Sequence, residues 1–153
     1  MDDAAAGKVA DTAAALFHSV HRHMREHVQG MDHTGLNWKP LPLANSVAVL
    51  ITHSLGSERE MLRALRSLAS DRDRPAEFKV EVGQVELLAM LDEADRELDV
   101  HVGALTAADL TEQGTRGEFG PRPGLVWLLS NYGHAREHLA QIELTKQLYD
   151  SRT

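Results

Sequence analysis

Hydrophobic positions recur along this chain at the spacing of an α-helix rather than that of a β-strand. Over four long stretches, apolar side chains return every three or four residues, so each stretch predicts a helix with one buried face. No stretch alternates convincingly between apolar and polar residues. The expected helices run from about Ala4 to Val28, from Asn45 or Ser46 to a point before residues 70–75, from about Gly83 to Gly103, and from about Pro123 to Asp150. Four such helices predict an all-α fold, a four-helix bundle.

The segments between these stretches are rich in residues that interrupt helices. Residues 30–45 contain two prolines and are expected to form a loop. Residues 105–110 predict a short turn of helix, because Thr106 and Asp109 have the spacing of a capping box. Residues 111–124 hold several glycines and are expected to be a flexible connection.

Composition narrows the class of protein. A length of 153 residues predicts a single domain over residues 1–153. The net charge of −7 argues against nucleic-acid binding. The absence of cysteine excludes disulfides, thiolate metal ligands and a cysteine nucleophile, and it fits a cytoplasmic location. The N-terminal residues lack the pattern of a signal peptide, and the longest central apolar run is too short to span a membrane, so no membrane partner is expected.

Nine histidines are the unusual feature of the composition, and two of them suggest a metal site. His134 and His138 lie four residues apart, which places them one helical turn apart on the inward side of the last helix. Burying two imidazoles is unfavourable unless their nitrogens are hydrogen-bonded or bind a metal. His53, at the border of the apolar face of the second helix, is the candidate third ligand. The pair alone leaves both explanations open, a metal site or histidines bonded to water and backbone.

The other histidines have simpler explanations. His23 and His27 repeat the four-residue spacing, but histidines are favoured in the last turn of a helix by its dipole. His18 and His21 fall mostly on the outer face of the first helix and are expected to be solvated. His101 is expected to be a core histidine with satisfied hydrogen bonds.

Glu58 is a carboxylate in an apolar environment. It falls near the middle of the apolar arc of the second helix, among Ile51, Met61 and Leu62. A carboxylate in such a place is seldom left unpaired. Its partner is expected to be either an arginine on another helix or the metal site.

Two segments carry a resemblance to a known family. GLNWKPLPLANSVAVLITHSLGSE, residues 35–58, combines a Trp-x-Pro loop, an Asn-Ser helix start and a histidine five residues before a glutamate. HAREHLAQIELTKQLY, residues 134–149, has a His-x-x-x-His-x-x-Gln pattern. In order and spacing, these segments resemble the DinB/YfiT-like superfamily of metal-binding four-helix bundles. The resemblance implies that His53, His134 and His138 bind one divalent ion, with Glu58 and Gln141 beside the ligands or in the cavity.

The resemblance also implies a class of chemistry. Three histidines and water leave an open position on the ion, as in catalytic sites. Those family members that have a known activity use the ion to bind low-molecular-weight thiols such as mycothiol or bacillithiol, in S-transferase or isomerase reactions, so the resemblance implies this chemistry. The alternatives are a metal-dependent hydrolase, a stress-associated metal-binding or scaffold protein without turnover, and a metal-free bundle. Imidazole ligands suit zinc or nickel, and also iron or copper. The expected partner is a small-molecule substrate.

The last helix also predicts a homodimer. Leu125, Tyr132 and Leu139 recur at seven-residue spacing on its charged side, flanked by Leu128 and Leu129. A second copy packed against this stripe would cover it. The alternative is that residues 111–124 fold back over the first part of the stripe.

Overall fold

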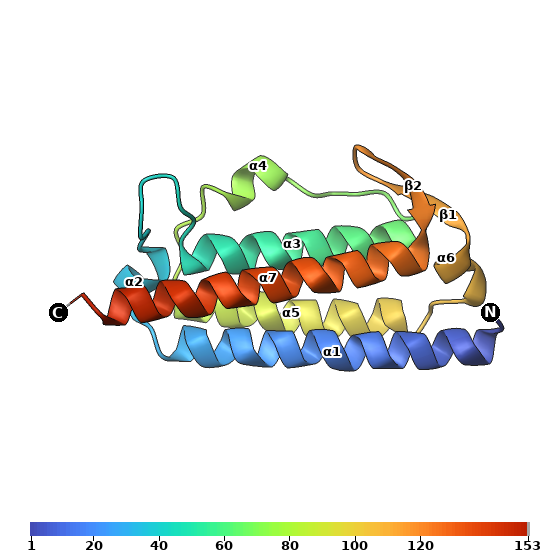
Figure 1. Cartoon of the computed structure of the whole chain (residues 1–153), viewed down its shortest axis with the longest axis horizontal. Coiled ribbons are helices and arrows are strands. Elements are labelled where there is room, and N and C mark those ends of the chain that lie inside the picture. Colours follow the sequence, from blue (N-terminus) through green and yellow to red (C-terminus); the bar gives the residue numbers. More distant parts are fainter. Residues whose placement is uncertain (153) are drawn as a thin grey trace.

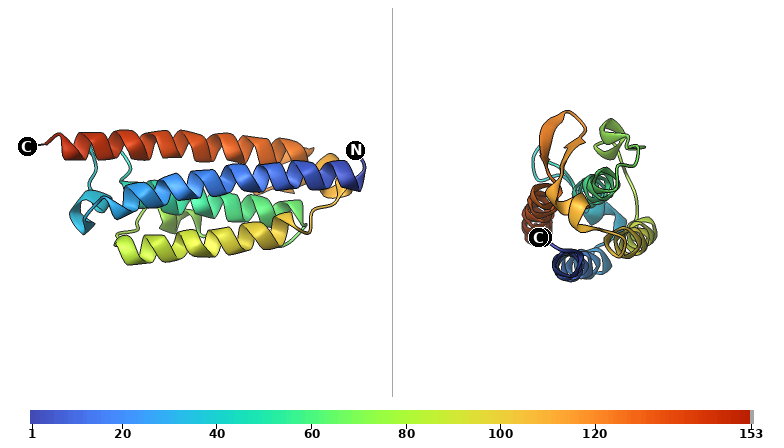
Figure 2. Two further views of the ribbon diagram at one scale, coloured as in Figure 1. Left: turned by 90° about the horizontal axis from the view of Figure 1, so that it is seen from below. Right: turned by 90° about the vertical axis from the view of Figure 1, so that its right-hand side faces the viewer.

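Four long helices form the body of the molecule. The computed structural model describes residues 1–152. The four helices are α1 (Asp3–Gln29), α3 (Val47–Leu65), α5 (Gln84–Val102) and α7 (Gly124–Asp150). Helices α1 and α7 run in one direction, and α3 and α5 run in the other (Figures 1 and 2). Each of α1 and α3 packs against both α5 and α7, so the predicted all-α four-helix bundle is confirmed.

The helix starts follow from local capping. Ser46 precedes α3, and its Oγ accepts a hydrogen bond from the Val49 backbone N–H at 3.3 Å. Asp2 caps α1 in the same way through Ala5. These oxygens satisfy backbone N–H groups that have no partner in the first turn.

The core lies where the four apolar faces meet. Every long helix contributes large side chains that are almost completely excluded from solvent. They are Phe17 and Met24 of α1, Ile51, Met61 and Leu62 of α3, Leu87, Leu91 and Leu98 of α5, and Leu128 and Ile142 of α7. Burial of these faces is the main stabilising contribution, because helices in proteins owe most of their stability to the packing of an apolar face rather than to intrinsic helix propensity.

The connections contain more structure than the sequence predicts. The expected loop over residues 30–45 includes the short helix α2 (His33–Asn37), and α4 (Arg74–Glu77) lies in the long connection between α3 and α5. Helix α6 (Ala107–Thr111) begins with the predicted capping box of Thr106 and Asp109.

The expectation of a flexible connection without strands is wrong for residues 113–123. Strand β1 (Gln113–Arg116) pairs antiparallel with β2 (Phe119–Pro123), and Gly117 takes a positive φ of 53° in the turn. The strands are short, mostly exposed and rich in glycine, proline and arginine, so their residues show no apolar alternation. The hairpin and α4 lie on the same side of the bundle (Figures 1 and 2).

None of the helices in residues 1–152 is both long and apolar enough to cross a membrane.

The apolar stripe of the last helix is partly covered within the chain. Leu128 and Leu139 are buried core residues, and Tyr132 packs edge-on against Phe17 of α1 with ring centroids 5.7 Å apart. Leu129 is the exposed member, at 58%. In a single chain the stripe is therefore only partly exposed, because α1 covers much of it. The homodimer itself stays a prediction.

Candidate metal centre

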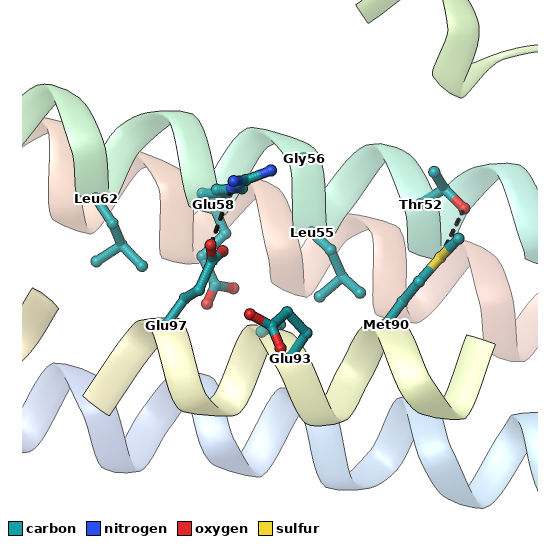
Figure 3. A pocket seen from close by; sticks show the side chains of 10 residues that line it. Thr52, Leu55, Gly56, Glu58, Leu62, Met90, Glu93 and Glu97 are labelled. Atoms are coloured by element: carbon teal, nitrogen blue, oxygen red, sulfur yellow. Dashed lines mark hydrogen bonds and ion pairs between the residues drawn. The ribbon is translucent and has the colours of Figure 1, made fainter. Parts of the chain in front are cut away.

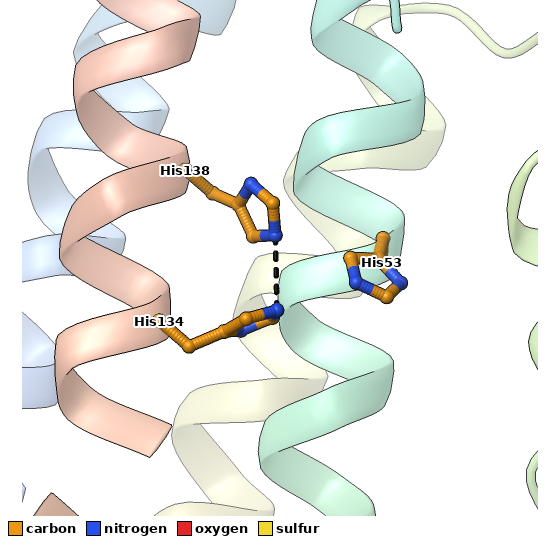
Figure 4. Close-up of side chains that lie close together, drawn as sticks. All are labelled: His53, His134 and His138. Atoms are coloured by element: carbon orange, nitrogen blue, oxygen red, sulfur yellow. Dashed lines mark hydrogen bonds between the residues drawn. The ribbon is translucent and has the colours of Figure 1, made fainter. Parts of the chain in front are cut away.

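Three histidines from two helices converge on one point. His53 projects from α3 towards His134 and His138, which lie one turn apart on α7 (Figure 4). The ring centroid of His53 lies 5.2 Å from that of His134 and 5.1 Å from that of His138. Each ring offers one nitrogen, and these three atoms all lie within 4.8 Å of one another. The group could hold a metal ion.

Two of the rings are fixed by hydrogen bonds on their outer nitrogens. His53 Nδ1 lies 2.8 Å from Glu77 Oε2, and His138 Nδ1 lies 2.8 Å from Gln141 Oε1. A neutral imidazole that donates Nδ1–H to an oxygen carries its lone pair on Nε2. Such outer contacts orient the ring and set the tautomer of metal-binding histidines.

Glu77 is itself held tightly. Arg72 donates from Nε to Glu77 Oε1 at 2.6 Å and from Nη2 to Oε2 at 2.8 Å. Burial raises the pKa of Glu77, but the hydrogen bonds from His53 and Arg72 outweigh burial and lower it below its usual value. Gly56 makes the approach possible, because a Cβ at that position would lie 2.1 Å from Glu77 Oε1. The site therefore has an ionised carboxylate directly behind His53.

The two histidines of α7 are electrically neutral at pH 7. Burial, followed by the neighbouring His138 and His53, lowers the pKa of His134 to about 4. Burial also lowers the pKa of His138, against the opposing hydrogen bond to Gln141. The neutral imidazole is the form that binds metals.

The donor set fits a divalent ion. His134 Nε2 and His138 Nε2 lie 3.0 Å apart, and two nitrogens on a tetrahedral ion at about 2.0–2.1 Å are about 3.3 Å apart. His134 Nδ1 is buried and has no hydrogen-bond partner within the described chain. The nitrogen that faces His138 is the other one, Nε2, and imidazole nitrogens that face one another in a buried cluster are unfavourable unless a proton or an ion binds them.

The comparisons with known proteins agree with this geometry. A family model described as the DinB superfamily matches residues 16–142. The chain belongs to the DinB superfamily. No curated protein matches it.

Two solved structures share the DinB bundle. One is a conserved protein from Enterococcus faecalis, 18% identical, with a TM-score of 0.77 over 92% of this chain and 96% of that one. The other is a DinB-like protein from Bacillus subtilis, 15% identical, with a TM-score of 0.72 over 93% of this chain and 94% of that one. At these identities the likeness shows the fold.

Glu58 differs from its expected position in this DinB chain. It is buried, but its Oε2 lies 2.9 Å from His21 Nε2 of α1, and no hydrogen bond joins it to the three clustered histidines of the described chain. Figure 3 shows Glu58 among the side chains lining a separate cavity between α3 and α5. The carboxylate beside the cluster is instead Glu77, which no sequence signal indicated, because it lies on a short polar helix far along the chain.

The expectation that His18 and His21 are solvated is wrong for His21. Only 1% of His21 is exposed, because α5 packs against this side of α1 and places Asp95 there. His21 Nδ1 lies 2.7 Å from Asp95 Oδ1, so both of its nitrogens contact carboxylates. His18, which is half-exposed, lies between Asp95 and Asp99, at 2.8 and 2.7 Å. The polar side chains between α1 and α5 thus form an ion-pair network.

The histidine pKa values in this second cluster are raised, whereas those of His134 and His138 are lowered. Burial lowers the pKa of His21, but the hydrogen bonds to Asp95 and Glu58 outweigh it and raise the pKa to about 9. The pKa of Asp95 is lowered by His21, Arg25 and His18, despite its burial. His21 is therefore an imidazolium ion at pH 7. In that state it has no lone pair for a metal.

Other histidines also differ from expectation or stay apart. His101 is half-buried, and its buried Nδ1 has no hydrogen-bond partner among residues 1–152. The expectation that its hydrogen bonds are satisfied is therefore wrong for this atom. His23 and His27 are half-buried on α1, and His23 Nδ1 lies 2.7 Å from the Ser19 carbonyl oxygen. Neither belongs to a group of metal-ligand atoms in the described chain.

Proposed function

We propose that this DinB-superfamily protein binds one divalent ion through His53, His134 and His138, and uses it in the chemistry of low-molecular-weight thiols. One observation carries the metal site: three imidazoles converge while the outer nitrogens of two are held by Glu77 and Gln141. The thiol chemistry, of the S-transferase or isomerase type, rests on the family resemblance.

A divalent ion held by three imidazoles keeps a position open and lowers the pKa of a thiol or water that binds there. The protein residues provide the surroundings. Glu77 fixes the ring of His53, and Arg72 fixes Glu77. Gln141 fixes the ring of His138. The burial of His134 keeps it neutral and ready to bind.

The metal and the reaction each have alternatives. Three imidazoles suit zinc or nickel, and iron or copper as second candidates. A metal-dependent hydrolase would use the same open position for water. A metal-binding or scaffold protein without turnover would keep the site and lack both reactions.

A thiol-consumption assay tests the proposal. Protein produced without a His-tag is loaded with zinc or nickel and mixed with a small thiol and 1-chloro-2,4-dinitrobenzene. In the transferase reaction the thiolate sulfur bonds to the ring carbon and chloride leaves. We expect thiol loss that depends on the metal and is abolished in His134→Ala. Metal binding without thiol loss, over a panel of thiols and electrophiles, would contradict the thiol chemistry and favour the hydrolase or the scaffold alternative.

A further inference from the structure

A cavity of about 290 Å³ opens directly beside the candidate metal centre. His53 and His134 form part of its wall, so a molecule in the cavity would touch the histidine cluster. The volume lies near the lower end of the range for small-molecule sites. Four arginines also line it: Arg72, Arg74, Arg116 and Arg122.

Two segments outside the four long helices supply these arginines. Arg74 lies on α4 and Arg72 just before it, whereas Arg116 and Arg122 come from β1 and β2 of the hairpin. Helix α4 and the hairpin lie on the same side of the bundle (Figure 1). Segments far apart in the sequence therefore meet at the cavity beside the histidines.

The carboxylates near the cavity neutralise only half of this positive charge. Arg72 is paired with Glu77 and with Glu60, at 2.6 and 2.9 Å. Arg116 is only 8% exposed and shares Glu60 at 3.3 Å. Burial lowers the pKa of the Arg116 guanidinium, so its charge is held there at an energetic penalty.

The other two arginines have no carboxylate partner. No salt bridge in residues 1–152 includes Arg74 or Arg122, and both are exposed. The Arg74 guanidinium lies 5.2 Å from the centre of the Phe78 ring, and that of Arg122 lies 5.4 Å from the Trp127 ring. Such contacts hold a guanidinium in place and leave its N–H donors free for a carboxylate.

We propose that this cavity binds the carboxylate groups of a small acidic molecule whose reactive end reaches His53 and His134. In a chain with a net charge of −7, a local excess of arginine marks a place for an anion. Guanidinium groups match carboxylates in shape and charge. The cavity shares two histidines with the metal centre. The part of the inference that concerns the reactive end therefore rests on the proposed function, whereas carboxylate binding by the arginines does not. The favoured thiol is one that carries carboxylates.

The anion site is tested separately from the metal. Succinate is titrated into metal-free protein by calorimetry at low salt. We expect binding that weakens more than 10-fold in Arg74→Gln/Arg122→Gln and weakens as salt is added. The matched control is Arg22→Gln/Arg136→Gln, which removes the same charge from exposed positions on α1 and α7 and should bind like the wild type. Both double variants alter exposed side chains, and their thermal unfolding shows whether they fold. Equal binding by the two doubles, or no binding by the wild type, overturns the inference.

Two further arms separate the ligand class from the proposed function. Inorganic phosphate, titrated in parallel, should bind more weakly than succinate; tighter phosphate binding overturns the assignment to carboxylates. Mercaptosuccinate and 2-mercaptoethanol are then compared on metal-loaded protein, and only the former should bind less tightly in the Arg74/Arg122 double variant. If succinate binding depends on these arginines but no metal binds, the proposed function fails and the anion site stands. If a thiol reaction occurs but neither succinate nor thiol binding depends on these arginines, the anion site fails and the proposed function stands.

Discussion

Two histidine clusters in one bundle have histidine pKa values shifted in opposite directions. His53, His134 and His138 lie between α3 and α7, and the pKa of His134 is lowered to about 4. His18 and His21 lie between α1 and α5, and the pKa of His21 is raised to about 9. Both clusters bring ligand atoms within reach of one another, yet only in the first are histidine pKa values lowered, those of His134 and His138.

The difference comes from where the carboxylates lie. In the α1–α5 cluster, carboxylates contact both nitrogens of each histidine, which raises the pKa of both rings and holds His21 as a cation. In the α3–α7 cluster, Glu77 touches only the outer nitrogen of His53, and the inner nitrogens face one another. In this molecule, the cluster whose carboxylate contacts only an outer ring nitrogen is the candidate metal site. The cluster whose carboxylates contact both nitrogens of each ring is an ion-pair network.

Removing one histidine from each cluster should give the largest difference between the two clusters, measured as the loss in the free energy of unfolding. His21→Ala leaves Glu58 buried without its hydrogen-bond partner, and we expect the free energy of unfolding to fall by about 3–5 kcal/mol. His134→Ala in the metal-free protein removes an imidazole with an unpaired nitrogen, and we expect a loss below about 2 kcal/mol. Urea denaturation measures both. Equal losses would show that the two clusters are not different in kind.

The pH dependence of stability should show the charge on His21. Its pKa rises from 6.5 in the unfolded chain to about 9 in the fold, so its contribution is fully present below pH 6.5 and is lost as the pH rises through 9. The free energy of unfolding should therefore fall by up to about 3 kcal/mol over this range. In His21→Leu/Glu58→Leu most of this decline should vanish. A decline of the same size in that variant would assign it to other groups.

The carboxylate behind His53 should tune metal affinity. Glu77→Gln keeps the size of the side chain but removes its charge, and we expect affinity to fall by about 10- to 100-fold. Gly56→Ala should have a similar effect, because the new methyl group displaces Glu77. Gly7→Ala, where nothing lies within 4 Å of the added carbon, is the control. Competition with a chelator measures the affinities. Unchanged binding in both Glu77→Gln and Gly56→Ala would remove Glu77 from the site.

The smallest effect is expected at Gln141. It is exposed, and its hydrogen bond to His138 is between neutral groups. Gln141→Ala should lower metal affinity by about 2- to 10-fold, which corresponds to a neutral hydrogen bond of about 0.5–1.5 kcal/mol. A larger loss than in Glu77→Gln would reverse the order of importance of the two contacts.

The long helices could be predicted because their apolar period persists over 19 to 27 residues. The hairpin could not, because its nine strand residues are mostly exposed and carry no alternation. Apolar spacing also does not mark the end of α3. Leu68 continues the apolar spacing, but the chain leaves the helix after Leu65, and Ser67 takes a positive φ of 52°.

The candidate site was predictable only where spacing along one helix carries the information. His134 and His138 share a face by their spacing, and His53 was indicated by its position beside an apolar arc. The contact of Glu77 with His53 depends on the path of residues 66–83 back over the bundle, which no local pattern specifies. The burial of His21 could not be predicted, because a polar face of one helix becomes interior when another helix supplies carboxylates to it.

Metal content of protein produced without a His-tag tests the central claim most directly. By elemental analysis, the wild type should carry one divalent ion per chain, and His134→Ala should carry almost none. His18→Ala, in the ion-pair network, and His23→Ala, in the pair of equal spacing on α1, should keep the ion. Undiminished metal in His134→Ala, or its loss in His18→Ala with the fold intact, would contradict the account.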